Sequence, residues 1–210
     1  METEMNDSAS ANRYDFPISI LYDTSTGKLE QYEKLVERRL RDLAPMYYDQ
    51  NAVEAVLARE DPLVYEIFYY SFPATKSDWG VGVSRIKSGT IGDEYYMTKG
   101  HFHDRDDQPE VYICTKGTGF LLMETAEGDF RADEFYPGVV THIPGHWSHR
   151  VVNTGAEDLS YIGVYSLSAG HVYEQVLERG FKQIVIKRDG KPIFLPNPRR
   201  KSPLTALEAT

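Results

Sequence analysis

Short runs of strand-forming residues, separated by turns rich in glycine, proline and aspartate, follow one another between residues 64 and 165. The turns recur about every eight to twelve residues, which is the spacing of an all-β sandwich or barrel. Residues 81–86 also alternate apolar with small or polar side chains, as a half-buried strand does. The expected strands lie at residues 64–70, 81–86, 110–114, 119–123, 129–132, 139–143, 150–153 and 159–165.

Helices are expected on both sides of these strands. Residues 29–43 carry apolar side chains at helical spacing, and Pro45 ends that stretch. Asn51 can cap a second short helix that runs to Ala58. After the strands we expect a third helix and a hairpin, at residues 171–178 with Gly180 at the helix end, and at residues 181–187 and 192–195 around the turn Asp189-Gly190.

These elements form one β domain with flanking segments, since the sequence shows neither an internal repeat nor a linker. A segment in front of a β domain often covers exposed edge strands. The expected boundaries are a flexible tail at residues 1–13, a helical or edge segment packed on the β domain at residues 14–62, the β domain at residues 63–198, and a C-terminal tail at residues 199–210.

The 32 acidic and 23 basic residues give a net charge of −9. This charge disfavours nucleic acid and anionic membranes as partners, because both present phosphates that need a basic patch. The single cysteine, Cys114, excludes an internal disulfide and a cysteine-based zinc site. Residues 1–12 lack the apolar run of a secretory signal, and no stretch approaches the roughly 18 apolar residues of a membrane span. We therefore expect a cytoplasmic protein that binds a small molecule.

All six histidines lie between residues 101 and 171. His101 and His103 stand two residues apart where a strand is expected to begin, so both imidazoles project from the same face. Glu110 follows seven residues later, after a polar loop, at the start of the next strand. Two imidazoles and one carboxylate on neighbouring strands can form a three-ligand face on a divalent metal. A fourth ligand should come from another strand, and the candidates are His142, His146, His149 and His171.

Two segments around these histidines resemble the two motifs of the cupin superfamily. The first, at residues 100–117, contains the His-Phe-His triplet and Glu110, and the second, at residues 138–153, contains a Pro-Gly-His-Trp-Ser-His run. The resemblance implies an all-β, jelly-roll-like barrel with short N-terminal helices. It also implies a metal held inside that barrel by His101, His103, Glu110 and His149.

A narrower resemblance is to the cupin-type, or archaeal-type, glucose-6-phosphate isomerase family. It rests on residues 98–103, 110–112, 142–150, 164–165 and 169–173, and it extends from about residue 70 to residue 198. The family implies reversible conversion of glucose 6-phosphate to fructose 6-phosphate, a step of glycolysis and gluconeogenesis. Nitrogen-rich ligation with open positions suits one divalent metal per subunit, iron(II) first, with manganese, nickel or zinc as alternatives. The resemblance to cupins, which often form homodimers, implies a homodimer.

The same resemblance assigns roles within the site. Glu110 is expected to be a ligand and is a candidate base for proton transfer between C1 and C2, whereas a metal-assisted hydride shift, the competing mechanism, needs no base. Tyr165 and His171 are the other candidate catalytic residues, His171 for opening the sugar ring. The substrate is expected to contact Ser84, Thr98, the backbone of Gly100, Tyr112, Tyr165 and Tyr173.

Neighbouring polar residues are expected to point elsewhere. By strand alternation Lys99, Arg150 and His142 face away from the metal ligands, and His146 lies in a Pro-Gly loop. Two other function classes also fit the motifs. One is another metal-dependent cupin enzyme, such as a dioxygenase, a decarboxylase or a different sugar-phosphate isomerase. The other is a non-catalytic sugar-binding cupin, a class that often loses metal ligands, whereas all four are present here.

Overall fold

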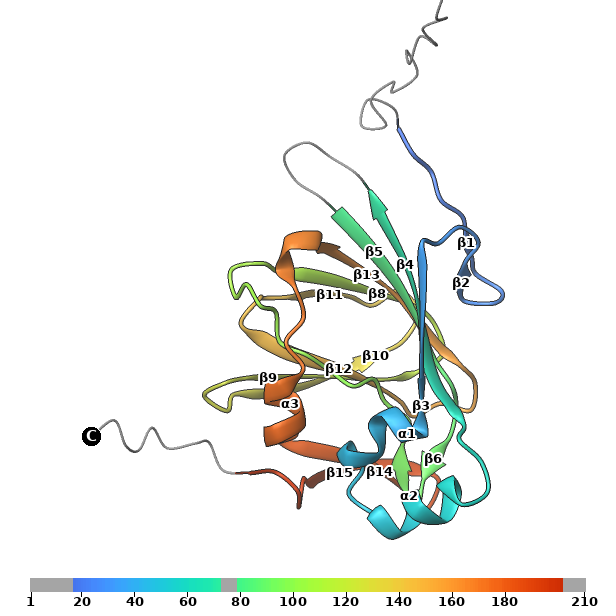
Figure 1. Ribbon diagram of the computed structural model, residues 1–210, viewed down its shortest axis with the longest axis vertical. Coiled ribbons are helices and arrows are strands. Elements are labelled where there is room, and N and C mark those ends of the chain that lie inside the picture. Colours follow the sequence, from blue (N-terminus) through green and yellow to red (C-terminus); the bar gives the residue numbers. More distant parts are fainter. Residues whose placement is uncertain (1–16, 73–78, 202–210) are drawn as a thin grey trace, which may run out of the picture.

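The computed structural model describes residues 17–72 and 79–201. Its largest sheet has six strands in the order β11-β8-β13-β5-β4-β3, and every neighbouring pair is antiparallel. A second antiparallel sheet, with the order β10-β9-β12, lies opposite it (Figure 1). The strands of the two sheets are β3 (Lys34–Arg39), β4 (Leu63–Phe72), β5 (Trp79–Ile86), β8 (Glu110–Lys116), β9 (Gly119–Thr125), β10 (Phe130–Phe135), β11 (Val140–Ile143), β12 (Trp147–Asn153) and β13 (Leu159–Ser166).

A third layer covers one end of the two sheets, at the bottom of Figure 1. It contains a four-stranded sheet with the order β15-β14-β7-β6 and the two N-terminal helices. The remaining elements are α1 (Leu40–Leu43), η1 (Ala44–Met46), α2 (Gln50–Leu57), η2 (Leu167–Ala169), α3 (Glu174–Arg179), β1 (Tyr22–Asp23), β2 (Lys28–Leu29), β6 (Thr90–Ile91), β7 (Glu94–Tyr95), β14 (Gln183–Arg188) and β15 (Lys191–Pro196).

Alternation along the strands decides which side chains enter the space between the sheets. In β8, Glu110, Tyr112 and Cys114 are buried, while Val111 and Ile113 on the other face are half-buried. The inner face of β8 thus carries a carboxylate and a phenol where an ordinary sheet would carry aliphatic side chains. A buried polar pair of this kind marks a site rather than core packing.

The predicted all-β fold with short N-terminal helices is confirmed. Each strand expected from the turn spacing is present, although β12 begins at Trp147, three residues before the predicted start at residue 150. The closing hairpin is also present, as β14 and β15, with Asp189 and Gly190 both at positive φ in the turn. Within the described residues, no helix is long and apolar enough to cross a membrane.

The predicted helix over residues 29–43 is wrong. Residues Lys34–Arg39 form β3, which pairs antiparallel with β4, and only Leu40–Leu43 are helical. Tyr32 and Leu35, two members of the apparent apolar stripe, are 46% and 40% exposed, so that stripe never becomes a buried helix face. Backbone pairing at a sheet edge therefore overrides the local helical pattern.

Three boundary predictions need smaller corrections. Asp49 caps α2, not Asn51, because its side chain accepts a hydrogen bond from the backbone N–H of Ala52. α3 begins at Glu174 rather than at residue 171, although Gly180 ends it as predicted. The predicted tail at residues 1–13 and residues 202–210 of the C-terminal tail lie outside the described residues.

Candidate metal site and cavity

Three segments bring four side chains together between the facing sheets. Glu110 is the first residue of β8, and His149 lies in β12 of the opposite sheet. His101 and His103 arrive on an extended segment, not at the start of a regular strand as predicted. His101 makes a single β-bridge with His149, whose N–H donates to the carbonyl of His101 at 3.1 Å. The chain then turns toward another partner before a ladder can form, since Phe102 bridges to Val172.

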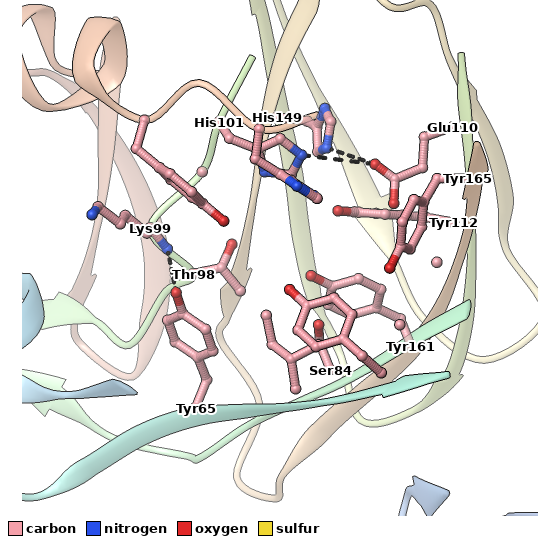
Figure 2. A pocket seen from close by; sticks show the side chains of 17 residues that line it. Tyr65, Ser84, Thr98, Lys99, His101, Glu110, Tyr112, His149, Tyr161 and Tyr165 are labelled. Atoms are coloured by element: carbon pink, nitrogen blue, oxygen red, sulfur yellow. Dashed lines mark hydrogen bonds and ion pairs between the residues drawn. The ribbon is translucent and has the colours of Figure 1, made fainter. Parts of the chain in front are cut away.

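The side-chain donor atoms of these four residues converge, and Figure 2 shows three of them, His101, Glu110 and His149. Glu110 Oε2 lies 3.1 Å from His149 Nε2, 3.3 Å from His103 Nε2 and 3.9 Å from His101 Nε2. The four candidate ligand atoms all lie within 4.8 Å of one another. Donors bound to one divalent ion at about 2.1 Å lie at most about 4.2 Å apart, and the three distances from Glu110 are all shorter than that.

Outer hydrogen bonds orient two of the imidazoles. His103 Nδ1 is 2.6 Å from the carbonyl oxygen of Gln108, and His149 Nδ1 is 3.2 Å from that of Trp147. Because a carbonyl only accepts hydrogen bonds, each Nδ1 carries a proton and leaves Nε2 to face Glu110. Metal-binding histidines are commonly oriented in this way, with one ring N–H on a backbone carbonyl and the other nitrogen toward the metal.

The titration behaviour of the cluster fits the same chemistry. Burial, together with the neighbouring histidines, lowers the pKa of His101 well below its ordinary value, so this imidazole is neutral at pH 7. Burial alone would raise the pKa of Glu110, but hydrogen bonds with His103 and His149 outweigh it and hold that pKa below its ordinary value. His101 Nε2 is buried without a hydrogen-bond partner. A neutral imidazole beside an ionised carboxylate suits a divalent metal.

A cavity lined with hydroxyl groups opens beside the cluster (Figure 2). β8, β13 and β5 are neighbours in the six-stranded sheet, and each contributes alternate residues to the cavity wall. The residues predicted to contact substrate all line it, and they are Ser84, Thr98, Gly100, Tyr112, Tyr165 and Tyr173.

His171 lies in the cavity wall within the stretch between β13 and α3. It is exposed to solvent, and its ring centroid lies 4.4 Å from that of His101 and 6.0 Å from that of Tyr173. The rings of His171 and Tyr173 are nearly parallel, with 9° between their planes. His171 therefore lies beside the cluster while remaining open to solvent.

The remaining histidines lie elsewhere, as predicted. His142 and His146 are exposed and do not belong to the cluster. Lys99 does point away from the histidines, yet it lines the cavity with its ammonium 4.7 Å from the centre of the Tyr173 ring. Arg150 is buried on the far side of this segment, where it donates to the carbonyl of Lys99 at 2.8 Å and holds the segment in place.

Sequence reasoning missed three tyrosines of the cavity wall, Tyr65, Tyr69 and Tyr161. The Oη atom of Tyr65 accepts a hydrogen bond from the backbone N–H of Lys99 at 3.4 Å, and the Tyr161 ring lies 4.5 Å from that of Tyr112. Tyr65 and Tyr69 share a face of β4 because they are four residues apart. That alternation was readable in the sequence, but it does not tell which face of β4 is turned to the cavity.

The fold and the site define an all-β protein with a histidine-rich cluster of metal-binding type beside a polar cavity. A family model described as glucose-6-phosphate isomerase matches residues 37–197 of the 210. The glucose-6-phosphate isomerase of Pyrococcus abyssi is 37% identical, with 90% of this chain and 100% of that protein covered. The putative glucose-6-phosphate isomerase 2 of Rhizobium meliloti is 36% identical, with 80% and 84% covered. The chain belongs to the glucose-6-phosphate isomerase family, which confirms the family predicted from the sequence.

Similarity to solved structures is weaker. An oxalate oxidase in complex with the substrate analogue glycolate covers 49% of each chain, with 14% identity and a TM-score of 0.39. An oxalate decarboxylase from Bacillus subtilis covers 51% of this chain and 26% of its own, with 17% identity and a TM-score of 0.42. Similarities at this level say nothing about the chemistry of this chain.

Proposed function

We propose that this protein interconverts glucose 6-phosphate and fructose 6-phosphate with the help of a divalent metal, as a step of glycolysis and gluconeogenesis. The observation that carries the proposal is the convergence of His101, His103, Glu110 and His149 beside a cavity lined with hydroxyl groups. It is supported by relatives of similar length that are named glucose-6-phosphate isomerase.

The reaction moves a carbonyl group between C1 and C2 of the open-chain sugar. Negative charge develops on the sugar oxygens as a proton leaves one carbon and returns to the other. A divalent cation, when bound, supplies positive charge beside those oxygens. The three histidines would hold it as neutral donors and Glu110 as an anionic one. Nitrogen-rich ligation suits iron(II), our first choice, and also manganese, nickel or zinc.

Glu110 is proposed first as a ligand. Its Oε2 faces all three histidines. Its Oε1 lies beside Gly163, where an added Cβ atom would be only 2.8 Å away from it. Its pKa, lowered by hydrogen bonds with His103 and His149 against the effect of burial, makes it a good anionic ligand and a weak base. If Glu110 also transfers the proton, deuterium from heavy water enters the product, whereas a hydride shift between the carbons introduces none.

Neutral donors are proposed to hold the sugar phosphate. The hydroxyl groups of Ser84, Thr98, Tyr112 and Tyr165 and the backbone N–H of Gly100 are assigned to oxygens of the substrate. Tyr173 is assigned to the same task beside His171. The position of His171 beside the cluster and open to solvent supports a role in opening the sugar ring, because an imidazole can move a proton between two oxygens.

A cytoplasmic location and a homodimer are proposed from composition and from the family resemblance. Cell fractionation tests the first. Sedimentation of the purified protein tests the second, and a monomeric mass at working concentration would contradict it.

The proposed activity is tested by incubating metal-loaded protein with glucose 6-phosphate and measuring fructose 6-phosphate. We expect turnover in both directions. Glucose, which lacks the phosphate, serves as the control substrate and should react far more slowly. An absence of turnover, together with oxygen uptake or decarboxylation on another substrate, would overturn the proposal in favour of a different metal-dependent enzyme.

A further inference from the structure

Two basic side chains stand on the edge strand that the sequence had assigned to a helix. In the pairing of β3 with β4, Lys34 lies opposite Tyr69 and Arg38 lies opposite Tyr65. Side chains directly opposite each other in an antiparallel pair project from the same face of the sheet. Because Tyr65 and Tyr69 line the cavity, Lys34 and Arg38 are directed to that same side of the sheet.

A groove continues from these cations into the cavity. Tyr65, Tyr69 and Tyr173 line both the groove and the cavity that holds the histidines, while Lys34 and Arg38 line the groove alone. The positive charge of Arg38 opposes the rise that burial causes in the pKa of both Tyr65 and Tyr173, which shows how near it lies to these rings. The groove and the cavity are thus two ends of one continuous depression.

Within residues 17–72 and 79–201, no ion pair joins Lys34 or Arg38 to an acidic side chain. Glu33 also lines the groove, and its carboxylate accepts a hydrogen bond from the backbone N–H of Ser71 at 3.2 Å. In a protein with a net charge of −9, cations gathered at the opening of a cavity attract anions locally.

We propose that Lys34 and Arg38, together with Lys99, form a basic rim that binds the phosphate group of the substrate. The inference rests on the proposed function and deepens it, because the donors assigned so far are neutral and leave a dianion uncompensated. The phosphate is the charged group of a hexose phosphate, so these cations act on it and not on the reacting carbons. Arginine and lysine are the side chains that bind phosphate most strongly.

The inference is tested with the double variant Lys34→Gln, Arg38→Gln. The matched control is Lys187→Gln, Arg188→Gln, which removes the same two charges from exposed positions on β14. We expect KM for glucose 6-phosphate to rise about tenfold in the rim variant, while kcat changes little. Losing a group that binds the ground state and the transition state equally raises KM and leaves kcat unchanged. The charge-retaining variant Lys34→Arg, Arg38→Lys should recover most of the affinity.

A binding measurement separates this inference from the proposed function. Sorbitol 6-phosphate cannot isomerise, and its affinity for metal-loaded protein can be measured by calorimetry. We expect weaker binding to the rim variant than to the control, with unchanged metal content and melting temperature. The proposal that the rim binds phosphate is overturned if the rim variant and the control bind sorbitol 6-phosphate equally. It is also overturned if the rim variant has a reduced metal content or melting temperature. A wild-type protein that binds sorbitol 6-phosphate through the rim but does not convert glucose 6-phosphate overturns only the proposed function.

Discussion

The two ends of the depression are built in different ways. At the histidine end, His101, His103 and Glu110 lie within ten residues of sequence, and His149 reaches them across the space between the sheets. At the rim, Arg38 lies 63 residues before His101 and arrives only through the pairing of an edge strand. The histidine end is buried and oriented by backbone carbonyls, whereas the rim is open to solvent. We therefore expect substitutions at the histidine end to abolish function and those at the rim to weaken it gradually.

The largest effect is expected from removing a metal-binding imidazole. His149→Ala deletes a fully enclosed nitrogen donor, so metal content and isomerase activity should both fall to background. Metal analysis and an activity assay on the same sample check this. His142→Ala, an exposed histidine on β11, is the control and should keep both. Full metal content and activity in His149→Ala would contradict the claim that substitutions at the histidine end abolish function.

The next substitution tests whether Glu110 acts as a metal ligand or as a base. Glu110→Gln keeps the shape of the side chain and removes its charge, so we expect weaker metal binding and activity that recovers partly when metal is added in excess. Metal titration combined with kcat at saturating metal measures this. If the variant keeps its metal while kcat falls by about 10²–10⁴-fold, Glu110 acts as the base.

A third substitution acts on the segment that connects the two ends. Gly100 has a φ of +74°, and a side chain there would meet the Phe181 ring at 2.8 Å and the His149 carbonyl at 3.0 Å. Gly100→Ala should lower the free energy of unfolding by about 1–2 kcal/mol from the backbone conformation alone, with the contacts adding to it. Because His101 follows directly, metal affinity should fall as well.

Gly138→Ala is the control for that substitution. Gly138 also has a positive φ, of +97°, but a side chain there would meet nothing within 4 Å. The Gly138→Ala variant should lose stability only because alanine disfavours a positive φ, and its metal affinity should be unchanged. Denaturant unfolding and metal titration of both variants decide the matter, and equal metal affinity in the two would show that Gly100 is not coupled to the histidines.

The smallest effect is expected from a single hydroxyl group near the rim. Tyr65→Phe removes the oxygen that accepts from the Lys99 N–H at 3.4 Å, a contact worth about 1 kcal/mol. We expect a rise of a few fold in KM for glucose 6-phosphate with unchanged metal content. Tyr136→Phe, at a half-exposed phenol outside the cavity, serves as the control. A loss of metal in Tyr65→Phe would contradict the separation of the two ends.

The sequence was most informative where spacing alone places the residues. His101, His103 and Glu110 lie within ten residues, on two neighbouring segments joined by one loop. Their proximity can therefore be predicted without knowing the order of strands in the sheet. His149 was identified because its motif resembled that of a known family. The turns between strands were readable for a similar reason, since glycine, proline and aspartate act locally.

The sequence was least informative where pairing between distant segments decides the outcome. Leu35 and Val36 fit a helical stripe, yet β3 pairs with β4, and only that register turns Arg38 toward Tyr65. The long-range register is not encoded in a short window of sequence. For the same reason, the sequence indicated that Arg150 faces away from the metal ligands but not that it supports the carbonyl of Lys99.

The central claim is that a metal held by the four-residue cluster is needed for isomerisation. It is tested most directly by measuring metal content and glucose 6-phosphate turnover on one preparation before chelation, after chelation and after metal is restored. We predict that turnover rises in proportion to metal bound, up to one ion per subunit, and that activity lost on chelation returns with iron(II). Turnover that persists undiminished in protein shown to be free of metal would contradict the account.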